Sequence, residues 1–284
     1  MISAPTRHRY RGRLKAVIFD WAGTLVDFGS LAPMGVFVEV FSRFGLEISV
    51  AEARAFMGLA KREHIAALLN LPRVADEFRS AYRRAPGEAD IDAIYQVFVP
   101  ANVAAIPRHC DAVPGAAETI ASLRARGLGI GSTTGYTREI MAVLAPLAAK
   151  QGVRVDAMVC AGDVPWGRPT PAMMYKCFLD LGVWPAAACV KVDDTPAGIG
   201  EGVAAGAWTV GVCVSGNAFG RSLAETTSMS PAEFAESRAA AAASLAGAGA
   251  HIVIDTVADL LPALARVEAR LATGAAPDDG PCGD

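Results

Sequence analysis

The second half of the chain alternates short apolar runs with helical stretches, and this alternation limits the fold more than any other feature. Such βαβ alternation predicts a doubly wound parallel sheet, an α/β fold with helices on both faces. The expected strands lie at 128–131, 157–160, 189–192, 208–212 and 251–254, with helices at 116–126, 138–149, 171–181 and 197–205 between them.

One further strand is expected near the N-terminus, where an apolar run ends at Asp20. The β signal then disappears, and helical periodicity takes over from about residue 29 to 107. We therefore expect an α/β core domain made of 1–28 and 108–272, and an inserted all-helical cap domain at 29–107. Because the insertion begins beside the end of the first strand, it is placed to act as a lid over Asp20. The Gly-, Pro- and Asp-rich tail at 273–284 is expected to be disordered.

Composition and charge exclude several classes of partner. The 284-residue chain is 52% hydrophobic and 19% charged, so it can bury a large core. Its net charge of -3 provides no basic field for a nucleic acid, and no apolar run is long enough to span a membrane. The six cysteines show no Cys-x-x-Cys spacing, which predicts buried thiols in a cytoplasmic protein rather than disulfides or a zinc site.

Four loops, each after an expected strand, carry side chains suited to phosphate chemistry. Asp20 ends the first strand, at the edge where open α/β sheets bind ligands. The segment 132–137, Ser-Thr-Thr-Gly-Tyr-Thr, offers hydroxyls and the N–H groups of a helix start to phosphate oxygens. Arg168 offers a guanidinium to the same anion. Asp193 and Asp194 form a carboxylate pair, which suits a hard cation.

Each of these features also has a purely structural explanation. The aspartates can form turns, the hydroxyls can cap a helix, and Arg168 can be a surface cation. Their order on successive strands argues against four separate coincidences. We therefore interpret the four loops as one site.

The order of these residues resembles the haloacid dehalogenase-like superfamily of phosphotransferases. In that superfamily, successive loops carry a nucleophilic Asp, a Ser or Thr, a Lys or Arg, and acidic metal ligands. The resemblance implies that Asp20 attacks phosphorus to form an aspartyl phosphate, while Mg²⁺ neutralises charge between its carboxylate and the phosphoryl oxygens. It also implies that the side chains of Asp20 and Asp194 and the backbone carbonyl of Ala22 hold the metal.

Two positions depart from the general pattern of the superfamily. An acid that protonates the leaving oxygen usually stands two residues after the nucleophile, but this chain has Ala22, which cannot transfer a proton. Another aspartate often stands four residues after the one at Asp194, where this chain has Gly198. Asp193 is a candidate replacement for that acid, which leaves the acidic set around the metal open.

The expected cap carries a reactive candidate of another kind in the segment 57–64, Met-Gly-Leu-Ala-Lys-Arg-Glu-His. A desolvated lysine close to other cations can be neutral near physiological pH and condense with a carbonyl to an imine. The common alternative for Lys61 is a solvated helix residue. The sequences at 20–24, 57–64 and 131–139 together look like the phosphonatase branch of the superfamily, and this resemblance covers residues 15 to about 259.

The phosphonatase resemblance implies hydrolysis of the carbon–phosphorus bond of phosphonoacetaldehyde, to acetaldehyde and phosphate, in 2-aminoethylphosphonate degradation. Cleavage of that bond expels no oxygen that needs a proton, but it does need an electron sink, which a Schiff base on Lys61 provides. Asp20 then accepts the phosphoryl group. Arg168 binds the phosphonate together with either Thr133 or Thr134.

Three further residues and one surface complete the expectations. His64, one helical turn after Lys61, either shuttles protons during imine formation or is simply packed. Met57 and Tyr136 either shape the substrate pocket or fill the core. The expected helix at 33–44 is apolar on more than one face. The resemblance implies a homodimer formed through the cap, and the alternative is burial under the other cap helices.

Two other functions are compatible with the sequence. The first is a phosphate-ester phosphatase of the same superfamily, to which Ala22 is the main objection. The second is a catalytically inactive binding or regulatory module that keeps the phosphate pocket. Retention of Asp20, Thr24, Arg168 and Asp194 argues against that module.

Overall fold

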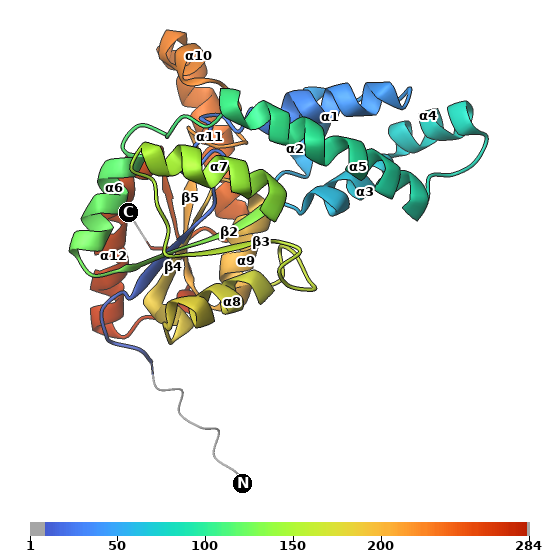
Figure 1. Ribbon diagram of the computed structural model, residues 1–284. Helices are drawn as coiled ribbons and strands as arrows, with labels where there is room; N and C mark the ends of the chain where they lie inside the picture. The colour runs from blue at the N-terminus through green and yellow to red at the C-terminus, as the bar shows by residue number, and fades with distance from the viewer. Residues whose placement is uncertain (1–8, 283–284) are drawn as a thin grey trace.

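A parallel six-stranded sheet forms the centre of the molecule (Figure 1). The computed structural model describes residues 9–282, so the first eight residues of the expected core lie outside the described part. The strand order is β3-β2-β1-β4-β5-β6, and every neighbouring pair is parallel. The strands are β1 (Ala16–Phe19), β2 (Gly129–Thr137), β3 (Ala157–Ala161), β4 (Cys189–Asp193), β5 (Trp208–Val212) and β6 (Ile252–Ile254).

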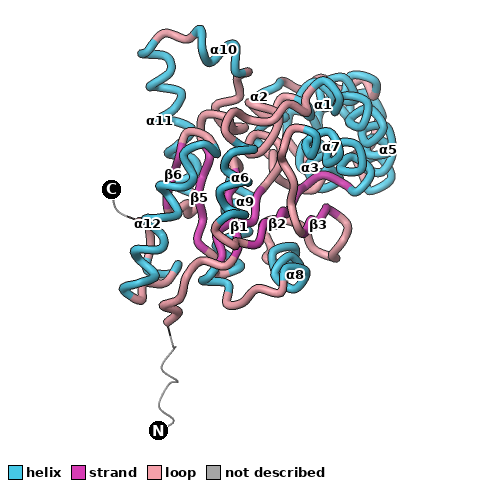
Figure 2. Tube along the Cα trace, turned by 60° about the vertical axis from the view of Figure 1, so that its left-hand side comes forward, coloured by secondary structure: helices cyan, strands magenta, loops and turns pink. Residues whose placement is uncertain are grey.

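Helices cover both faces of the sheet (Figure 2). One face packs against α6 (Ala116–Ala125), α7 (Arg138–Lys150) and α12 (Leu260–Thr273). The other face packs against α8 (Ala172–Leu181), α9 (Pro196–Ala205) and α11 (Pro231–Gly247). The short helix α10 (Leu223–Ser228) comes just before α11 in the chain. Alternation along β1 matches the two layers, because Val17 and Phe19 join one hydrophobic cluster while Ala16 and Ile18 join the other. The predicted doubly wound α/β fold is confirmed.

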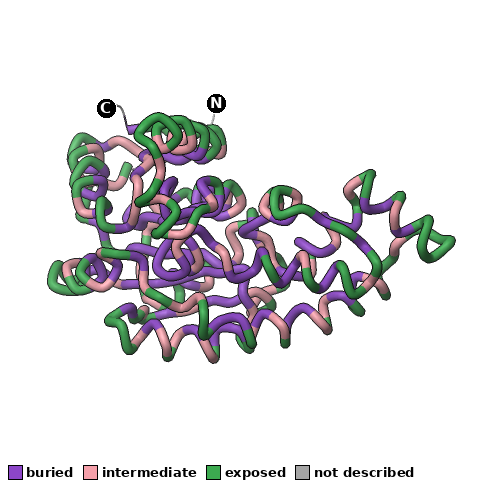
Figure 3. Tube along the Cα trace, turned by 90° about the horizontal axis from the view of Figure 1, so that it is seen from above, coloured by how far each residue is buried: buried purple, intermediate pink, exposed green. Residues whose placement is uncertain are grey.

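The chain between β1 and β2 is helical, as the sequence predicts. Its helices are α1 (Ala32–Arg43), α2 (Val50–Ala55), α3 (Lys61–Leu69), α4 (Pro72–Tyr82) and α5 (Glu88–Ala105). They pack around a hydrophobic cluster of their own, whose largest members are Phe37, Phe41, Phe78 and Phe98. In Figure 3 this group projects from one side of the sheet and keeps its own buried interior. The helical insertion therefore has a core separate from that of the sheet.

Strand β2 is longer than the sequence predicts. The expected strand ended at Gly131 and gave way to a loop that opens a helix, whereas β2 continues to Thr137. Its register with β3 shifts between Thr134 and Thr137, so the polar residues form an irregular extension of the strand. Helix α7 begins only after Thr137, whose side chain accepts a hydrogen bond from the backbone N–H of Ile140.

The chain after α12 also differs from the expected disordered tail. A 3₁₀ turn forms at Pro277–Asp279, and Asp279 pairs with Arg9 at the other end of the chain. Cys282 is buried, and its N–H donates to the carbonyl of His251. Apolar and backbone contacts of this kind hold the segment despite its Gly- and Pro-rich composition. Residues 283–284 lie outside the described residues.

Within residues 9–282, no helix combines the length and apolar character needed to cross a membrane. The described cysteines are all free, and five of the six are buried, in agreement with the expected buried thiols.

Replacing Ile18 with alanine tests the central position of β1. Ile18 is fully buried against α8, so its truncation leaves a cavity and should lower the free energy of unfolding by about 2–5 kcal/mol. Urea denaturation measures the change. Leu179→Ala on the same helix is the matched control, since Leu179 is 81% exposed and its loss should cost little. Equal effects of the two substitutions would contradict the assigned core.

Candidate active site

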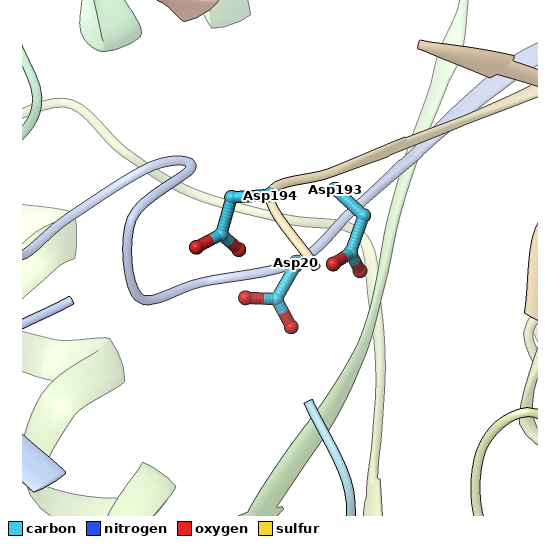
Figure 4. A group of neighbouring side chains, drawn as sticks. All are labelled: Asp20, Asp193 and Asp194. Atoms are coloured by element: carbon cyan, nitrogen blue, oxygen red, sulfur yellow. The ribbon is translucent and has the colours of Figure 1, made fainter. Parts of the chain in front are cut away.

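The carboxyl ends of β1 and β4 bring three aspartates together (Figure 4). Asp20 follows β1, Asp193 ends β4, and Asp194 follows it. On one side of β1 lie β2 and then β3, and on the other side lie β4, β5 and β6. The strand order therefore reverses direction between β1 and β4, and open α/β sheets bind ligands at such a switch point. The three carboxylates are buried, and one oxygen of each lies within 4.8 Å of the others.

Asp20 and Asp194 carry negative charge that the protein does not fully balance. Burial and the charge of Asp193 together raise the pKa of Asp20 to about 6, against the opposing effect of Arg168. Burial, together with Asp20 and Asp193, raises the pKa of Asp194 well above its ordinary range. A divalent cation would relieve this repulsion, and carboxylate oxygens are the ligands that such hard cations prefer. The cluster therefore fits a metal ion.

Two polar groups hold the Asp194 carboxylate, and Ala22 lies beside it in the cavity. Its Oδ2 accepts a hydrogen bond of 2.7 Å from the backbone N–H of Asn217, and its Oδ1 lies 3.4 Å from the hydroxyl of Thr24. Ala22 lines the same cavity as Asp20 and Asp194. Asp194 is thus held in place from two sides.

Asp193 differs from the other two aspartates because it forms ion pairs with two buried cations. Its Oδ1 accepts hydrogen bonds from the backbone N–H of Thr195 at 3.0 Å and from the Thr195 hydroxyl at 2.7 Å. Its Oδ2 lies 3.0 Å from Lys191 Nζ and 3.4 Å from Arg168 Nη2. Burial alone would raise the pKa of Asp193, but the two cations outweigh burial and lower it below its ordinary value.

Arg168 is a buried member of the site and not a surface cation. It is 5% exposed, and its Nη2 lies 2.9 Å from Asp20 Oδ1. Its Nε donates to Glu201 Oε2 at 3.1 Å, and its Nη2 also donates to the backbone carbonyl of Thr133. The guanidinium is therefore fixed beside the expected nucleophile, where it can bind an anion that approaches Asp20.

Thr133 and Thr134 have different surroundings. The Thr133 hydroxyl donates to Glu201 Oε2 at 2.7 Å and accepts from Lys191 Nζ at 2.7 Å, so it is engaged below the cavity. Thr134 lines the cavity itself, and its Oγ1 accepts a 3.1 Å hydrogen bond from the N–H of Tyr136. That bond leaves the hydroxyl proton of Thr134 available to a ligand. The expected N–H groups of a helix start are absent at both residues, because α7 begins only at Arg138.

Lys61 is the first residue of α3 and points into the site. It is 3% exposed, and its Nζ lies 5.0 Å from the ring centroid of Tyr136, 5.6 Å from that of Phe37 and 3.8 Å from Met57 Sδ. Burial lowers the pKa of Lys61 to about 8, even though the charge of Asp20 favours the ammonium form. The solvated-helix interpretation is wrong, and the amine has the environment that imine formation requires.

His64 is neutral in this structure. Burial and the charge of nearby Lys61 together lower its pKa to about 3, against the opposing effect of its hydrogen bond to Ala53. Its Nε2 lies 2.8 Å from the carbonyl of Ala53, which assigns the proton to Nε2 as a donor. Its Nδ1 is buried without a hydrogen-bond partner among the described residues, and the ring packs on Phe37 with centroids 4.1 Å apart. His64 is thus packed, yet it keeps one unprotonated nitrogen.

The helical insertion closes over the aspartates and leaves a small cavity of about 20 Å³ between the two parts. Gly58 makes this approach possible, since its φ is +93° and a Cβ there would lie 2.3 Å from Thr195 Oγ1. Arg54 of α2 donates to the carbonyls of Gly29, Asn217 and Gly220. The cavity brings together most of the residues expected to form the site, namely Asp20, Ala22, Met57, Lys61, Thr134, Tyr136, Arg168 and Asp194.

Several residues of the site were not found by sequence reasoning. Lys191 and Glu201 are fully buried charges beneath Arg168, and Ser30 lines the cavity with no hydrogen-bond partner for its hydroxyl among the described residues. A lysine inside the apolar strand 189–193 and a glutamate on a helix otherwise free of charge were signals in the sequence. Ser30 gave no such signal.

The fold and site are those of a haloacid dehalogenase-like hydrolase, and the model of that family matches residues 14–206. A phosphonoacetaldehyde hydrolase from Paraburkholderia phytofirmans is 56% identical over 93% of this chain and 99% of its own length. One from Hahella chejuensis is 48% identical over 95% of this chain and 92% of its own. Within that class, the chain belongs to the phosphonoacetaldehyde hydrolase family.

A solved structure agrees with this assignment. The phosphonoacetaldehyde hydrolase-like protein of Oleispira antarctica superposes with a TM-score of 0.94 at 41% identity, covering 98% of this chain and all of that one. The similarity therefore includes the helical insertion as well as the sheet.

Competitive acylation of lysines tests the depressed pKa of Lys61. Because the neutral amine reacts, labelling of Lys61 by a small acylating reagent should rise between pH 7 and 9 with a midpoint near 8. Mass spectrometry of the peptide gives the extent of labelling. In denatured protein the midpoint should move up to about 10.5, the ordinary value. An unchanged midpoint on unfolding would contradict the desolvated site.

Proposed function

We propose that this protein hydrolyses the carbon–phosphorus bond of phosphonoacetaldehyde through a Schiff base on Lys61 and an aspartyl phosphate on Asp20. One observation carries the proposal: a buried amine with a pKa near 8 and a carboxylate at a strand end line the same small cavity. The relatives named phosphonoacetaldehyde hydrolase support this choice of substrate.

Lys61 prepares the carbon side of the bond. Its neutral amine adds to the aldehyde, and loss of water gives a protonated imine. That imine accepts the electron pair released when the carbon–phosphorus bond breaks, so the leaving group is an enamine and not an unstabilised carbanion. Protonation of the enamine at carbon and hydrolysis of the resulting imine release acetaldehyde and restore Lys61. The apolar and aromatic walls formed by Phe37, Met57 and Tyr136 keep the amine desolvated.

Asp20 takes the phosphorus side of the bond. Its carboxylate attacks phosphorus as the carbon–phosphorus bond breaks, and water then hydrolyses the aspartyl phosphate to phosphate. Arg168 binds and orients the phosphonate, since its Nη2 already lies 2.9 Å from Asp20 Oδ1. Thr134 donates its free hydroxyl proton to the same group, while Thr133 holds the network below. No acid is needed at Ala22, because no oxygen leaves.

Mg²⁺ is the proposed metal, held by the side chains of Asp20 and Asp194 and the backbone carbonyl of Ala22. It supplies charge neutralisation between the nucleophilic carboxylate and the phosphoryl oxygens. The support is the donor set, since these are buried oxygen ligands with excess negative charge.

The remaining expectations form part of the same proposal. Residues 29–107 act as a cap whose loop at 57–59 closes on the core domain, 1–28 and 108–272. His64 moves protons during imine formation through its unprotonated Nδ1. The enzyme works in the cytoplasm, and it accepts phosphonoacetaldehyde formed from 2-aminoethylphosphonate.

Incubation with phosphonoacetaldehyde and Mg²⁺ tests the reaction. Acetaldehyde and phosphate should appear in equal amounts, and chelation of the metal should stop both. A phosphate ester turned over faster than phosphonoacetaldehyde would instead favour the phosphatase, which is the runner-up function. Release of phosphate from any phosphonate would exclude the inactive binding module.

Borohydride reduction tests the role of Lys61. With substrate present, reduction should inactivate the enzyme and leave an adduct on Lys61 that peptide mass spectrometry locates. Lys61→Arg keeps the positive charge but cannot form an imine, so it should lower kcat by about 10⁴-fold or more. Lys150→Arg, on the sheet domain, is the control. Normal turnover by Lys61→Arg would rule out the imine mechanism.

We also propose that the protein forms a homodimer through the cap. Phe37, Val40 and Phe41 of α1 are buried within the chain itself, which leaves Val38 and the following Phe44 as partly exposed apolar side chains. A second copy would cover this remaining face.

Sedimentation velocity tests the dimer. Wild-type protein should sediment as a dimer at micromolar concentration, and Val38→Glu should shift it to monomer by burying a charge at the interface. Circular dichroism should show unchanged helix content in the variant. A wild-type monomer under the same conditions would refute the proposed dimer.

A further inference from the structure

Helix α9 packs on the end of β4 through a glycine that makes room for Asp193. A Cβ added to Gly198 would lie 1.9–2.2 Å from the three atoms of the Asp193 carboxyl group. The backbone of Gly198 lies in an ordinary helix and its φ is not positive, so its conformation does not require glycine. The Asp193 carboxylate therefore occupies the space that a side chain at position 198 would take.

A second glycine repeats this relationship one helical turn later. A Cβ at Gly202 would lie 2.7 Å from the Cβ of Lys191 and 2.6 Å from Cγ2 of Thr209. Lys191 and Asp193 are alternate residues of β4 and so face the same helix. The strand thus places one cation and one anion beneath the two glycines.

These two residues belong to a buried group of four charges. Lys191 Nζ lies 3.0 Å from Asp193 Oδ2 and 3.3 Å from Glu201 Oε2. Arg168 lies between the same two acids, with Nε 3.1 Å from Glu201 and Nη2 3.4 Å from Asp193. Two cations and two carboxylates balance each other. The guanidinium is fixed from both sides, and its Nη2 remains directed at Asp20.

We propose that Asp193 is a positioning residue that fixes Arg168 for the phosphoryl group, and that it is not a metal ligand. The Asp193 carboxylate, carried by strand β4, occupies the space that a carboxylate at position 198 of helix α9 would occupy, and it can pair with Arg168 from there. The ion pairs support this assignment, because Asp193 pairs with both Lys191 and Arg168, whereas among the described residues Asp20 pairs with Arg168 alone and Asp194 pairs with no cation. The inference depends on the proposed function only in assigning Arg168 to the phosphoryl group.

Binding measurements on Asp193→Asn and Asp194→Asn separate the two roles. Calorimetry with Mg²⁺ alone should give a Kd for Asp193→Asn within about threefold of wild type, and a far weaker Kd for Asp194→Asn. With Mg²⁺ saturating, inorganic phosphate should bind Asp193→Asn roughly 10- to 100-fold more weakly, because Arg168 has lost a charged partner. Neither arm requires carbon–phosphorus cleavage, so failure here is distinct from failure of the proposed function.

A swap of the two residues tests whether the position of the carboxylate, and not its parent residue, matters. Asp193→Gly should lose phosphate affinity, and the double variant Asp193→Gly/Gly198→Asp should recover most of it. The helix tolerates the change, since position 198 lies in the first turn of α9, where a carboxylate is favourable. Gly198→Asp alone should unfold at lower temperature, because its side chain collides with Asp193.

Two results would overturn the proposal. One is a loss of Mg²⁺ affinity in Asp193→Asn as large as in Asp194→Asn, which would make Asp193 a ligand. The other is unchanged phosphate binding in Asp193→Asn, which would leave Asp193 with no effect on Arg168. Recovery of phosphate affinity in the folded double variant is the result that a merely structural role would not produce.

Discussion

The packing of negative charge at the carboxyl ends of β1 and β4 is the constraint on which the rest of the structure depends. Three aspartates share one buried edge of the sheet, and like charges at this separation cannot all be ionised without compensation. The protein balances Asp193 with Lys191 and Arg168 and leaves Asp20 and Asp194 short of positive charge. The proposed metal ion would offset this deficit of positive charge beside the proposed nucleophile, Asp20.

The two parts of the molecule divide the proposed chemistry between them. The sheet holds Asp20, Arg168 and Thr134, which act on phosphorus. The helical insertion holds Lys61, which acts on carbon, in a pocket dry enough to lower the pKa of an amine to about 8. Ala22 fits this division, because an electron sink on the cap replaces a proton donor on the core. In the proposed mechanism the contact between the insertion and the sheet is part of the reaction, since it brings the two groups into one cavity.

Much of this arrangement could be predicted from the sequence, because it depends on local patterns. Alternating β and helical runs fixed the strand positions, and the order of Asp20, Arg168 and Asp194 followed from placing each at a strand end. The choice between Thr133 and Thr134 did not follow. It depends on an irregular extension of β2 that turns one hydroxyl toward Glu201 and the other into the cavity.

Other features depend on packing between distant segments. The proposed role of Asp193 depends on its packing against Gly198 and on its ion pair with Lys191, and no sequence pattern links these positions. The neutral state of His64 depends on its burial and on the nearby charge of Lys61, which a helix pattern does not reveal. The ordered segment before Cys282 likewise results from contacts with residues far away in the chain.

Rapid-quench mass spectrometry of the Asp20 peptide tests the central claim most directly. The claim is that Asp20 accepts the phosphoryl group only after Lys61 has formed an imine with the substrate. Mixed with phosphonoacetaldehyde and Mg²⁺, wild-type protein should show a transient phosphoryl adduct on Asp20, and Lys61→Arg should show none. A phosphoryl adduct on Asp20 in Lys61→Arg would contradict the account.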